Sequence, residues 1–359
     1  MQLQDQNILF FTRTMDLGGT ENVIIQLCEI FQPLVNKIVV CSCGGVNEAN
    51  LKNMGIKHYT IPDIEKKSPS VLHEVRKTLK EIIRTENITV IHTHHRMAAF
   101  YTQLLGDKNK VIRINTSHST FYDKRLLTRI AFSGFHLIAC GEGVKKSLVG
   151  GLGFDPNRIT VICNGVKKDN GERTPISEIE KAREQGKHVF AIIGRLTEVK
   201  GVAYLIKAVP LLKTENVCCV VTGTGPDETK LKNLAKGLGI ADKIVFLGFR
   251  RDVANIISQV DFVVQPSFQE GLPLVPIEAF SEGKPVIGTN IDGTSEIVRN
   301  NENGLLIPAG NEIELAKAID YMCSIDRTRF EGNAAETYEK KYSFDVFANG
   351  YIDYYKAID

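Results

Sequence analysis

Long hydrophobic runs are missing from this 359-residue chain, and none approaches the ~18 residues that a membrane-spanning helix needs. Segment 1–6 has no basic residue ahead of the apolar stretch 8–11, so the sequence does not predict a secretory signal peptide. Internal repeats and low-complexity tracts are also absent. With 43% hydrophobic and 24% charged residues, the chain has the composition of a globular protein, and its length suggests two domains. We expect a cytoplasmic protein, or one that works at the cytosolic face of a membrane.

Metal-binding cysteine patterns are missing too. The chain has eight cysteines, but no CxxC pair and no zinc-ligand spacing. Cys41 and Cys43 alternate within the strand-like run 38–43, and Cys218 and Cys219 lie inside the apolar run 217–221. In buried strands cysteine behaves as a small hydrophobic residue. The sequence therefore predicts a reduced chain.

The net charge of +2 is distributed unevenly. Residues 1–170 carry 22 Lys+Arg and 15 Asp+Glu, which is +7, whereas the remainder carries 22 and 27, which is −5. Seven of the eight histidines also lie in the first part. This asymmetry indicates either a polyanionic partner or membrane surface acting on one half, or simple scatter of charge over solvated surfaces. No stretch is basic enough to form a tail, and we expect no nucleic-acid partner.

Short β-branched runs alternate with helical patterns in two series along the chain. Such alternation builds parallel sheets with helices on both faces, so the sequence predicts an α/β fold with two Rossmann-like domains. The predicted strands are 8–12, 38–43, 88–92, 111–115 and 137–140 in the first series, and 188–194, 217–223, 244–247, 262–265 and 285–288 in the second. The predicted helices are 20–31, 71–86, 202–212, 229–238 and 344–355.

The polar segment 167–187 separates the two series and is expected to hold a linker and one short helix. We predict an N-terminal domain of residues 1–166 plus the returning segment 343–359, and a C-terminal domain of residues 167–342. Ligands of open α/β sheets bind beyond the carboxyl ends of the strands. Two such domains would face each other across a central cleft, with strand-end loops on both sides.

A glycine pair follows the first predicted strand. Gly18 and Gly19 open the helix 20–31, where small residues let backbone amides approach a phosphate. The pattern is not GxGxxG and no Walker lysine follows, so neither NAD binding nor P-loop chemistry is indicated. A glycine-rich turn without a ligand remains the alternative.

Two cations follow strand 188–194. Arg195 can fork two phosphate oxygens and Lys200 can supply a point charge, which together suit a diphosphate. The alternative is a solvated turn in which Glu198 neutralises one of them.

A pair of glutamates follows strand 262–265. Glu270 precedes a helix start and can accept hydrogen bonds from sugar hydroxyls. Glu278 lies inside the same largely apolar helix, where a carboxylate is costly to bury unless it meets a hydroxyl pair such as that of a ribose.

Together these motifs resemble those of the retaining glycosyltransferases of family 4, which have the GT-B fold. The resemblance covers about residues 8–310 in the correct order. Its matching features are Gly18-Gly19-x-Glu21, Gly194-Arg195-Leu196-x4-Gly201, Glu270-x7-Glu278, Gly283-x-Pro285-Val286-Ile287 and Gly293-Thr294-x-Glu296-Ile297-Val298.

The resemblance also implies a role for each matched residue. It implies that Arg195 and Lys200 hold the diphosphate, that Glu270 contacts the transferred sugar and that His118 touches the donor sugar. It further implies that Glu278 binds the ribose of the nucleotide. The other donor-side residues would be Gly18 and Gly19 from the N-terminal domain, Gly223, Phe249 and Arg250 around the base, and Gly271, Leu272 and Pro273, which would lend backbone amides near the phosphate.

The resemblance implies transfer of a hexose or N-acetylhexosamine from a nucleotide-diphosphate sugar, and we expect a UDP-sugar. The acceptor would be a glycan or a lipid-linked group in the synthesis of cell-surface polysaccharide such as capsule. No DxD carboxylate pair occurs, so neither a metal nor another cofactor is expected. Retention would proceed by same-face attack, with the departing phosphate taking the proton. The alternatives are another GT-B enzyme, such as a nucleotide-sugar epimerase or phosphorylase, or a catalytically silent glycan-binding protein.

Two further segments belong to the N-terminal domain, which we expect to bind the acceptor. In the run 92–95, His92 and His94 would share one face of a strand, and metal binding, substrate contact by His94 and His95, or a structural role are all open. The segment 120–129 mixes aromatic residues and leucines with Lys124, Arg125 and Arg129. It could rest on an anionic membrane, where each cation contributes ~1 kcal/mol, or it could be an ordinary exposed helix.

Overall fold

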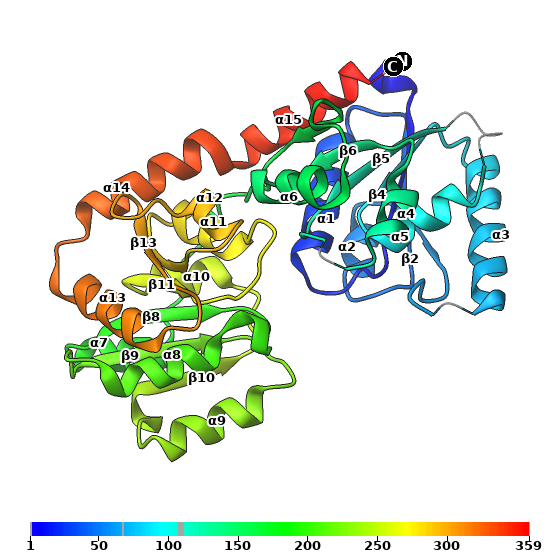
Figure 1. Cartoon of the computed structure of the whole chain (residues 1–359). Coiled ribbons are helices and arrows are strands. Elements are labelled where there is room, and N and C mark those ends of the chain that lie inside the picture. The colour runs from blue at the N-terminus through cyan, green and yellow to red at the C-terminus, as the bar shows by residue number, and fades with distance from the viewer. Residues whose placement is uncertain (1, 67, 107–110, 122, 359) are drawn as a thin grey trace. The chain divides into compact units, whose positions relative to one another are not determined.

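The computed structural model describes residues 2–66, 68–106, 111–121 and 123–358. The chain divides into two compact units: unit 1 comprises Met1–Asn164 and Phe347–Asp359, and unit 2 comprises Gly165–Val346. Each unit contains one parallel β-sheet with helices packed on it (Figure 1). The predicted α/β fold with two Rossmann-like sheets is therefore confirmed.

Unit 1 is built on a seven-stranded sheet of order β3-β2-β1-β4-β5-β6-β7. Its central strand β1 (Asn7–Phe11) is buried along its whole length, as expected for a parallel strand with both faces covered. The other strands are β2 (Lys37–Ser42), β3 (Lys57–Thr60), β4 (Val90–Thr93), β5 (Ile112–Ser117), β6 (His136–Ala139) and β7 (Ile159–Val161). The helices are α1 (Gly19–Phe31), α2 (Glu48–Asn53), α3 (Pro69–Thr85), α4 (Arg96–Gln103), α5 (Arg125–Phe132), α6 (Glu142–Lys146) and the last helix, α15 (Phe344–Ala357), which begins in unit 2.

Unit 2 repeats the plan with a six-stranded sheet of order β10-β9-β8-β11-β12-β13. Its strands are β8 (His188–Ile193), β9 (Val217–Thr222), β10 (Ile244–Gly248), β11 (Phe262–Gln265), β12 (Val286–Thr289) and β13 (Gly304–Ile307). Its helices are α7 (Ser177–Glu184), α8 (Val202–Ala208), α9 (Glu228–Gly237), α10 (Val253–Ser258), α11 (Leu274–Ser281), α12 (Thr294–Ile297), α13 (Glu312–Ser324) and α14 (Thr328–Thr337). The predicted helix 202–212 is shorter than expected, because Pro210 falls in a 3-10 turn (Val209–Leu211) that follows α8.

The strand order reverses once in each sheet. In unit 1 the reversal lies between β1 and β4, and in unit 2 between β8 and β11. At such a switch point the loops leaving the two neighbouring strands run to opposite sides and open a crevice at the carboxyl edge of the sheet. Residues that follow β8 and β11 are therefore placed for ligand binding.

None of the eight cysteines forms a disulfide, and Cys41, Cys218 and Cys219 are buried within strands as the sequence indicates. In the ranges that the structure describes, no helix has both the length and the apolarity to cross a bilayer.

Helix α15 is fixed to unit 1 by tyrosines that reach its sheet. The hydroxyl of Tyr355 lies 2.8 Å from Nδ1 of His92, and that of Tyr351 lies 3.0 Å from Oγ1 of Thr116. Nε2 of His92 is 2.8 Å from the same threonine hydroxyl. All four side chains are buried, so this network holds the C-terminal helix on β4 and β5 through directed hydrogen bonds.

Tyr355→Phe is expected to lower the free energy of unfolding by about 1–3 kcal/mol, because it leaves a buried ring nitrogen of His92 without its partner. Tyr354→Phe is the matched control, since no hydrogen bond of the Tyr354 hydroxyl occurs among the described residues. Urea denaturation of both variants measures the difference. Equal stabilities of the two variants would show that the network contributes nothing.

Candidate active site

The loop after β8 is pressed against the loop after β11. Gly201 adopts a φ of +69°, and a Cβ there would lie 2.0 Å from the carbonyl oxygen of Pro266. The amide of Phe268 donates to the carbonyl of Val199 at 2.8 Å. Only glycine fits at position 201, and its presence brings Lys200 beside the end of β11.

The loop after β9 packs on the loop after β8, and the end of β10 packs in turn on the loop after β9. The amide of Gly223 donates to the carbonyl of Gly248 at 2.7 Å. A Cβ at Gly223 would lie 1.9 Å from the carbonyl oxygen of Gly194, so this predicted donor residue is needed for close backbone packing. Phe249 and Arg250 follow directly and therefore stand beside Gly223.

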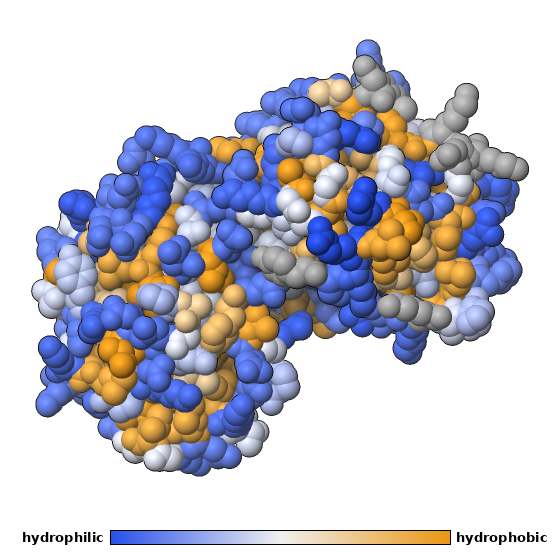
Figure 2. Space-filling view, in the orientation of Figure 1, coloured by the Kyte–Doolittle hydropathy of each residue, from blue (hydrophilic) through white to orange (hydrophobic). Residues whose placement is uncertain are grey.

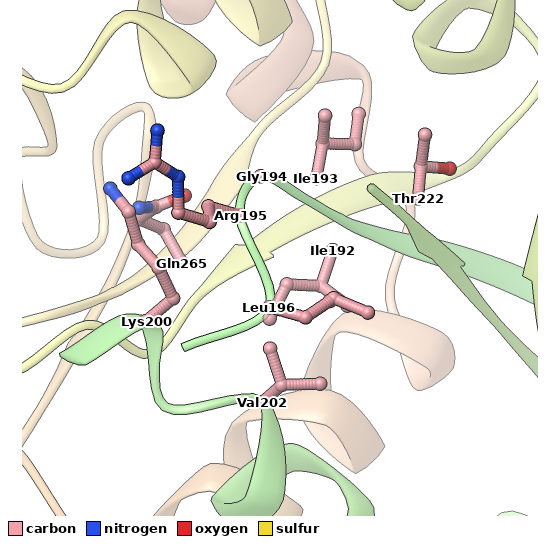
Figure 3. Close-up of a pocket in the computed structure, with 9 residues that line it drawn as sticks. All are labelled: Ile192, Ile193, Gly194, Arg195, Leu196, Lys200, Val202, Thr222 and Gln265. Atoms are coloured by element: carbon pink, nitrogen blue, oxygen red, sulfur yellow. The ribbon is translucent and has the colours of Figure 1, made fainter. Parts of the chain in front are cut away.

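An ion pair joins two of the predicted catalytic residues across the switch point. Nζ of Lys200, after β8, lies 2.7 Å from Oε1 of Glu270, after β11. The same oxygen accepts from Nε2 of Gln265 at 2.7 Å. The side chain of Glu270 is only 9% exposed and that of Lys200 is 31% exposed. The Arg195 side chain is exposed and extends to the same side of the loop as Lys200 and Gln265 (Figure 3).

Buried polar atoms line the hollow at this point of unit 2. Oγ1 of Thr222 and Oε1 of Gln265 are buried and have no hydrogen-bond partner within the described part of the chain. Both residues line one hollow together with Arg195 and Lys200 (Figure 3). A buried polar atom without a partner costs about 1–3 kcal/mol, and these two belong to the residues that end β9 and β11.

Gln265 and Thr222 are site residues that the sequence analysis missed. Each is the last residue of an otherwise apolar, fully buried strand. A polar residue that ends such a run at the carboxyl edge of a parallel sheet is the signal that could have identified both.

Glu278 lies inside α11, the helix that follows Glu270. Burial raises the pKa of Glu278 to about 7. Across residues 2–66, 68–106, 111–121 and 123–358, no hydrogen bond or ion pair reaches its carboxylate. The carboxylate is therefore poised between its two protonation states, and hydroxyl donors of a ligand would stabilise the ionised form.

The turn before α11 corrects one expectation. Pro273 is the N-cap residue of α11 and cannot lend a backbone amide, because proline has no N–H. Gly271 and Leu272, which precede it, retain theirs. Gly293 packs on this turn: a Cβ there would lie 2.2 Å from the carbonyl oxygen of Gly271, and the φ of Gly293 is +81°. The Gly293 motif therefore packs directly against the Glu270–Gly271 turn.

Arg250, predicted to lie near the base, is engaged within its own loop. Its guanidinium binds both carboxylate oxygens of Asp252, at 2.8 Å and 2.6 Å. Through this hydrogen bonding the guanidinium holds the pKa of Asp252 well below its usual range. Phe249 is 48% exposed. The exposed ring, rather than the neutralised arginine, is the group at this turn that a planar base could stack on.

Gly18 and Gly19 stand at the start of α1, where the sequence places them. Gly18 is the N-cap residue, and a Cβ on it would lie 2.4 Å from Oε2 of Glu21. Oε1 of Glu21 accepts from the hydroxyl of Thr14 at 2.8 Å. The absence of a side chain at Gly18 therefore lets the Glu21 carboxylate fold back over the first turn of the helix.

His118 follows β5 and pairs with His94, which follows β4. Nδ1 of His94 lies 2.9 Å from Nε2 of His118, and the rings are stacked. Nε2 of His94 is buried without a partner in the described chain, so a proton there would have no acceptor. The His94 proton therefore belongs on Nδ1, which donates to His118, and the His118 proton belongs on Nδ1 of its own ring.

Burial also keeps this pair neutral. It lowers the pKa of His118 to about 4 and that of His94 well below the usual value. A neutral His118 with its proton on Nδ1 is a hydrogen-bond donor at that atom, and it is not an acid at neutral pH.

The other two histidines of the run 92–95 have structural partners. Both ring nitrogens of His92 are engaged, by Tyr355 and Thr116. His95 is the N-cap of α4, and its Nδ1 accepts from the amide of Met97 at 3.2 Å. No group of three His, Cys, Asp or Glu side chains arranged to hold a metal ion occurs among the described residues.

The predicted membrane-side cations lie at and within α5. Lys124 is the N-cap, with a φ of 47°, and Arg125 and Arg129 lie in the first and last turns. All three are exposed. Tyr122, which belongs to the same predicted segment, lies outside the described residues. The predicted site residues therefore form separate groups: Arg195, Lys200, Glu270 and Glu278 with the glycine loops in unit 2, and the His94–His118 pair, the Gly18–Gly19 turn and α5 in unit 1.

Two family models match this chain. Residues 17–170 match Glycosyltransferase Family 4, and residues 175–337 match Glycosyl transferases group 1. An uncharacterized glycosyltransferase of Methanocaldococcus jannaschii is 27% identical over 298 residues, covering 79% of this chain and 72% of that protein. The UDP-Gal:alpha-D-GlcNAc-diphosphoundecaprenol alpha-1,3-galactosyltransferase of Escherichia coli is 26% identical over 251 residues, covering 64% of this chain and 65% of that protein.

A solved structure shows the same fold. The crystal structure of Anabaena HepE in complex with UDP-glucose superposes with a TM-score of 0.84 at 21% identity, covering 98% of this chain and 100% of that chain. The two family models together span nearly the whole chain, and each match falls almost entirely within the main segment of one unit. The chain belongs to the family 4 type of GT-B glycosyltransferases.

Proposed function

We propose that this glycosyltransferase moves a hexose or N-acetylhexosamine from a UDP-sugar to a glycan or lipid-linked acceptor, with retention of configuration and without a metal. The observation that carries the proposal is the ion pair of Lys200 with Glu270, supported by Gln265, which joins the loops after β8 and β11 where the sheet order reverses. The name of the Escherichia coli relative specifies a UDP-galactose donor, and Anabaena HepE was solved with UDP-glucose. Both support a uridine nucleotide as the carrier of the donor sugar.

The diphosphate is the leaving group in this reaction, and its growing negative charge is what the site must stabilise. Arg195 supplies a forked guanidinium and Lys200 a point charge. Lys200 is bound to Glu270 in the structure described here, at 2.7 Å. When a phosphate takes Lys200, Gln265 still donates to Glu270 and holds its carboxylate near the end of β11, where it accepts from hydroxyls of the sugar.

The remaining roles follow from protonation. The carboxylate of Glu278 accepts hydrogen bonds from the two ribose hydroxyls. These hydrogen bonds stabilise its ionised form, which burial alone disfavours. His118 donates its Nδ1 proton to an oxygen of the sugar. His118 is a weak base, because burial lowers its pKa and its Nε2 already accepts from His94, so the departing phosphate takes the proton of the acceptor hydroxyl during same-face attack.

The acceptor in this proposal carries a phosphate, is linked to a lipid and is presented at the cytosolic face of a membrane. The positive charge of the N-terminal part of the chain and the exposed cations of α5 support it. Such an acceptor fits the synthesis of cell-surface polysaccharide by a cytoplasmic enzyme. A nucleotide-sugar epimerase or phosphorylase, or a silent glycan-binding protein, would not transfer the sugar of a UDP-sugar to an added acceptor, so a transfer assay separates these alternatives.

Arg195→Ala and Lys200→Ala are each expected to lower turnover about 10²–10³-fold, because each removes a preorganised charge from the leaving group. Melting temperatures should change little, since Arg195 is exposed and Glu270 retains Gln265. Lys230→Ala, an exposed lysine of α9 in the same unit, is the control and should keep full turnover. Unchanged turnover in both site variants would remove these cations from the reaction.

Uridine affinity is expected to rise with pH through about 7, because Glu278 binds the ribose hydroxyls only as a carboxylate and its pKa lies near 7. Uridine has no phosphate, so only the protein titrates near that pH. Glu278→Gln should bind uridine more weakly and with no such pH dependence. Calorimetric titration between pH 6 and pH 8 measures both effects.

Glu270→Gln is the contrasting variant. It should bind UDP at least as tightly as the wild type, because Lys200 loses the partner that competes with phosphate, but it should transfer sugar poorly. If Glu270→Gln and Glu278→Gln weaken UDP binding equally, the division of roles between the two glutamates is wrong.

A further inference from the structure

A second hollow, of about 160 Å³, lies in unit 1. Its floor is apolar: Phe132, Phe135 and Leu137 are all nearly fully buried. Exposed Arg129 and Arg158 and half-buried Phe154 line its mouth. The proposed transfer reaction uses none of the floor residues and does not use Arg158.

This hollow belongs to the opposite edge of the sheet from the strand-end loops. Phe135 immediately precedes β6, and Phe154 lies in the segment that leads into β7, so both belong to the amino ends of these strands. His94 and His118 follow the carboxyl ends of β4 and β5. The hollow is therefore not part of the crevice in which α/β sheets bind their usual ligands.

Among the described residues, neither arginine at the mouth has an acidic partner. No ion pair or side-chain hydrogen bond of Arg129 or Arg158 occurs in the part of the chain that the structure describes. Asp155, the acidic residue nearest to Arg158 in sequence, caps its own 3-10 turn by accepting from the amide of Asn157 at 2.9 Å. Unneutralised guanidiniums above an aromatic floor suit an anion that carries an apolar group, since guanidinium forks phosphate oxygens and the rings pack against hydrocarbon.

The outer face of α5 indicates where such a ligand comes from. Leu126 is 73% exposed and Ile130 is 50% exposed, although both are large hydrophobic residues. They are one turn apart and form a single stripe with Arg129. Figure 2 shows hydrophobic residues gathered where Figure 1 places α5, with strongly hydrophilic residues beside them. Apolar side chains flanked by cations are the pattern of a helix that lies in the interface of an anionic bilayer.

We propose that this hollow is a headgroup site for an anionic phospholipid, with its phosphate on Arg129 and Arg158 and its glycerol and first methylenes over Phe132 and Phe154. Leu126 and Ile130 enter the bilayer interface beside it. The site adds a specific lipid contact to the general attraction of α5 for negative charge. This proposal rests on the proposed membrane-presented acceptor, whereas the hollow itself is separate from the proposed donor site.

The test uses the full-length protein and dihexanoyl phosphatidylglycerol below its micelle concentration. Calorimetry should show saturable binding to the wild type. Arg158→Ala removes one phosphate ligand without altering α5, and Ser133→Glu places a negative charge at the mouth; each should weaken binding about tenfold, the usual effect of losing a charged hydrogen bond. Arg84→Ala, an exposed arginine of α3, is the charge-matched control and should bind like the wild type.

Two further ligands separate the possible sources of the anion. Glycerol 1-phosphate should bind far more weakly than the short-chain lipid, and dihexanoyl phosphatidylcholine, whose net charge is zero, should also bind weakly. Vesicles containing phosphatidylglycerol should retain the wild type and the Arg84→Ala variant better than the Arg158→Ala variant.

Equal binding of the short-chain lipid by the wild type, Arg158→Ala and Ser133→Glu would overturn the proposal. Glycerol 1-phosphate binding as tightly as the lipid would also overturn it, because the hollow would then be a site for free phosphate. UDP titration of the same proteins keeps the two hypotheses apart. A variant that loses lipid binding but still binds UDP is affected at this hollow alone. Absent UDP binding in the wild type would instead refute the proposed donor site.

Discussion

The ion pair between Lys200 and Glu270 is the contact on which the proposed donor site of unit 2 depends. It joins the loop after β8 to the loop after β11, the two strands between which the sheet order reverses. Gln265 donates to the same carboxylate oxygen, so Glu270 keeps one partner when Lys200 leaves. A phosphate can therefore replace the carboxylate on Lys200 without leaving Glu270 without a partner, which is the exchange that the proposed mechanism requires.

Close approach of backbones makes that contact possible. Side chains at Gly201, Gly223 and Gly293 would each collide with a neighbouring carbonyl, at 2.0, 1.9 and 2.2 Å from an added Cβ. All three also have positive φ, which glycine adopts without strain. The glycines of the sequence motifs thus bring the loops of four strands together, and the charged residues occupy the space that results.

The sequence predicts the central strands and the order of the motifs because buried parallel strands are continuous apolar runs. It did not reveal β3, whose residues are exposed or half-buried at the edge of the sheet, or the three-residue β7 at the other edge. Arg195, Lys200 and Glu270 could be named from their spacing after strands. Other features of the site could not be predicted, because they depend on which strands are neighbours in the sheet. These features are the Lys200–Glu270 distance, the unpartnered oxygens of Thr222 and Gln265, and the His94–His118 pair. The backbone-amide role predicted for Pro273 is wrong, because proline has no amide proton to donate.

Hydrogen–deuterium exchange with and without UDP tests the central claim most directly, because it locates the nucleotide without any substitution. The account predicts slower amide exchange on UDP addition in residues 194–201, 222–225 and 265–278, which follow β8, β9 and β11 or form α11. Protection confined to segments of unit 1, or unchanged exchange in all three of these segments at saturating UDP, would contradict it.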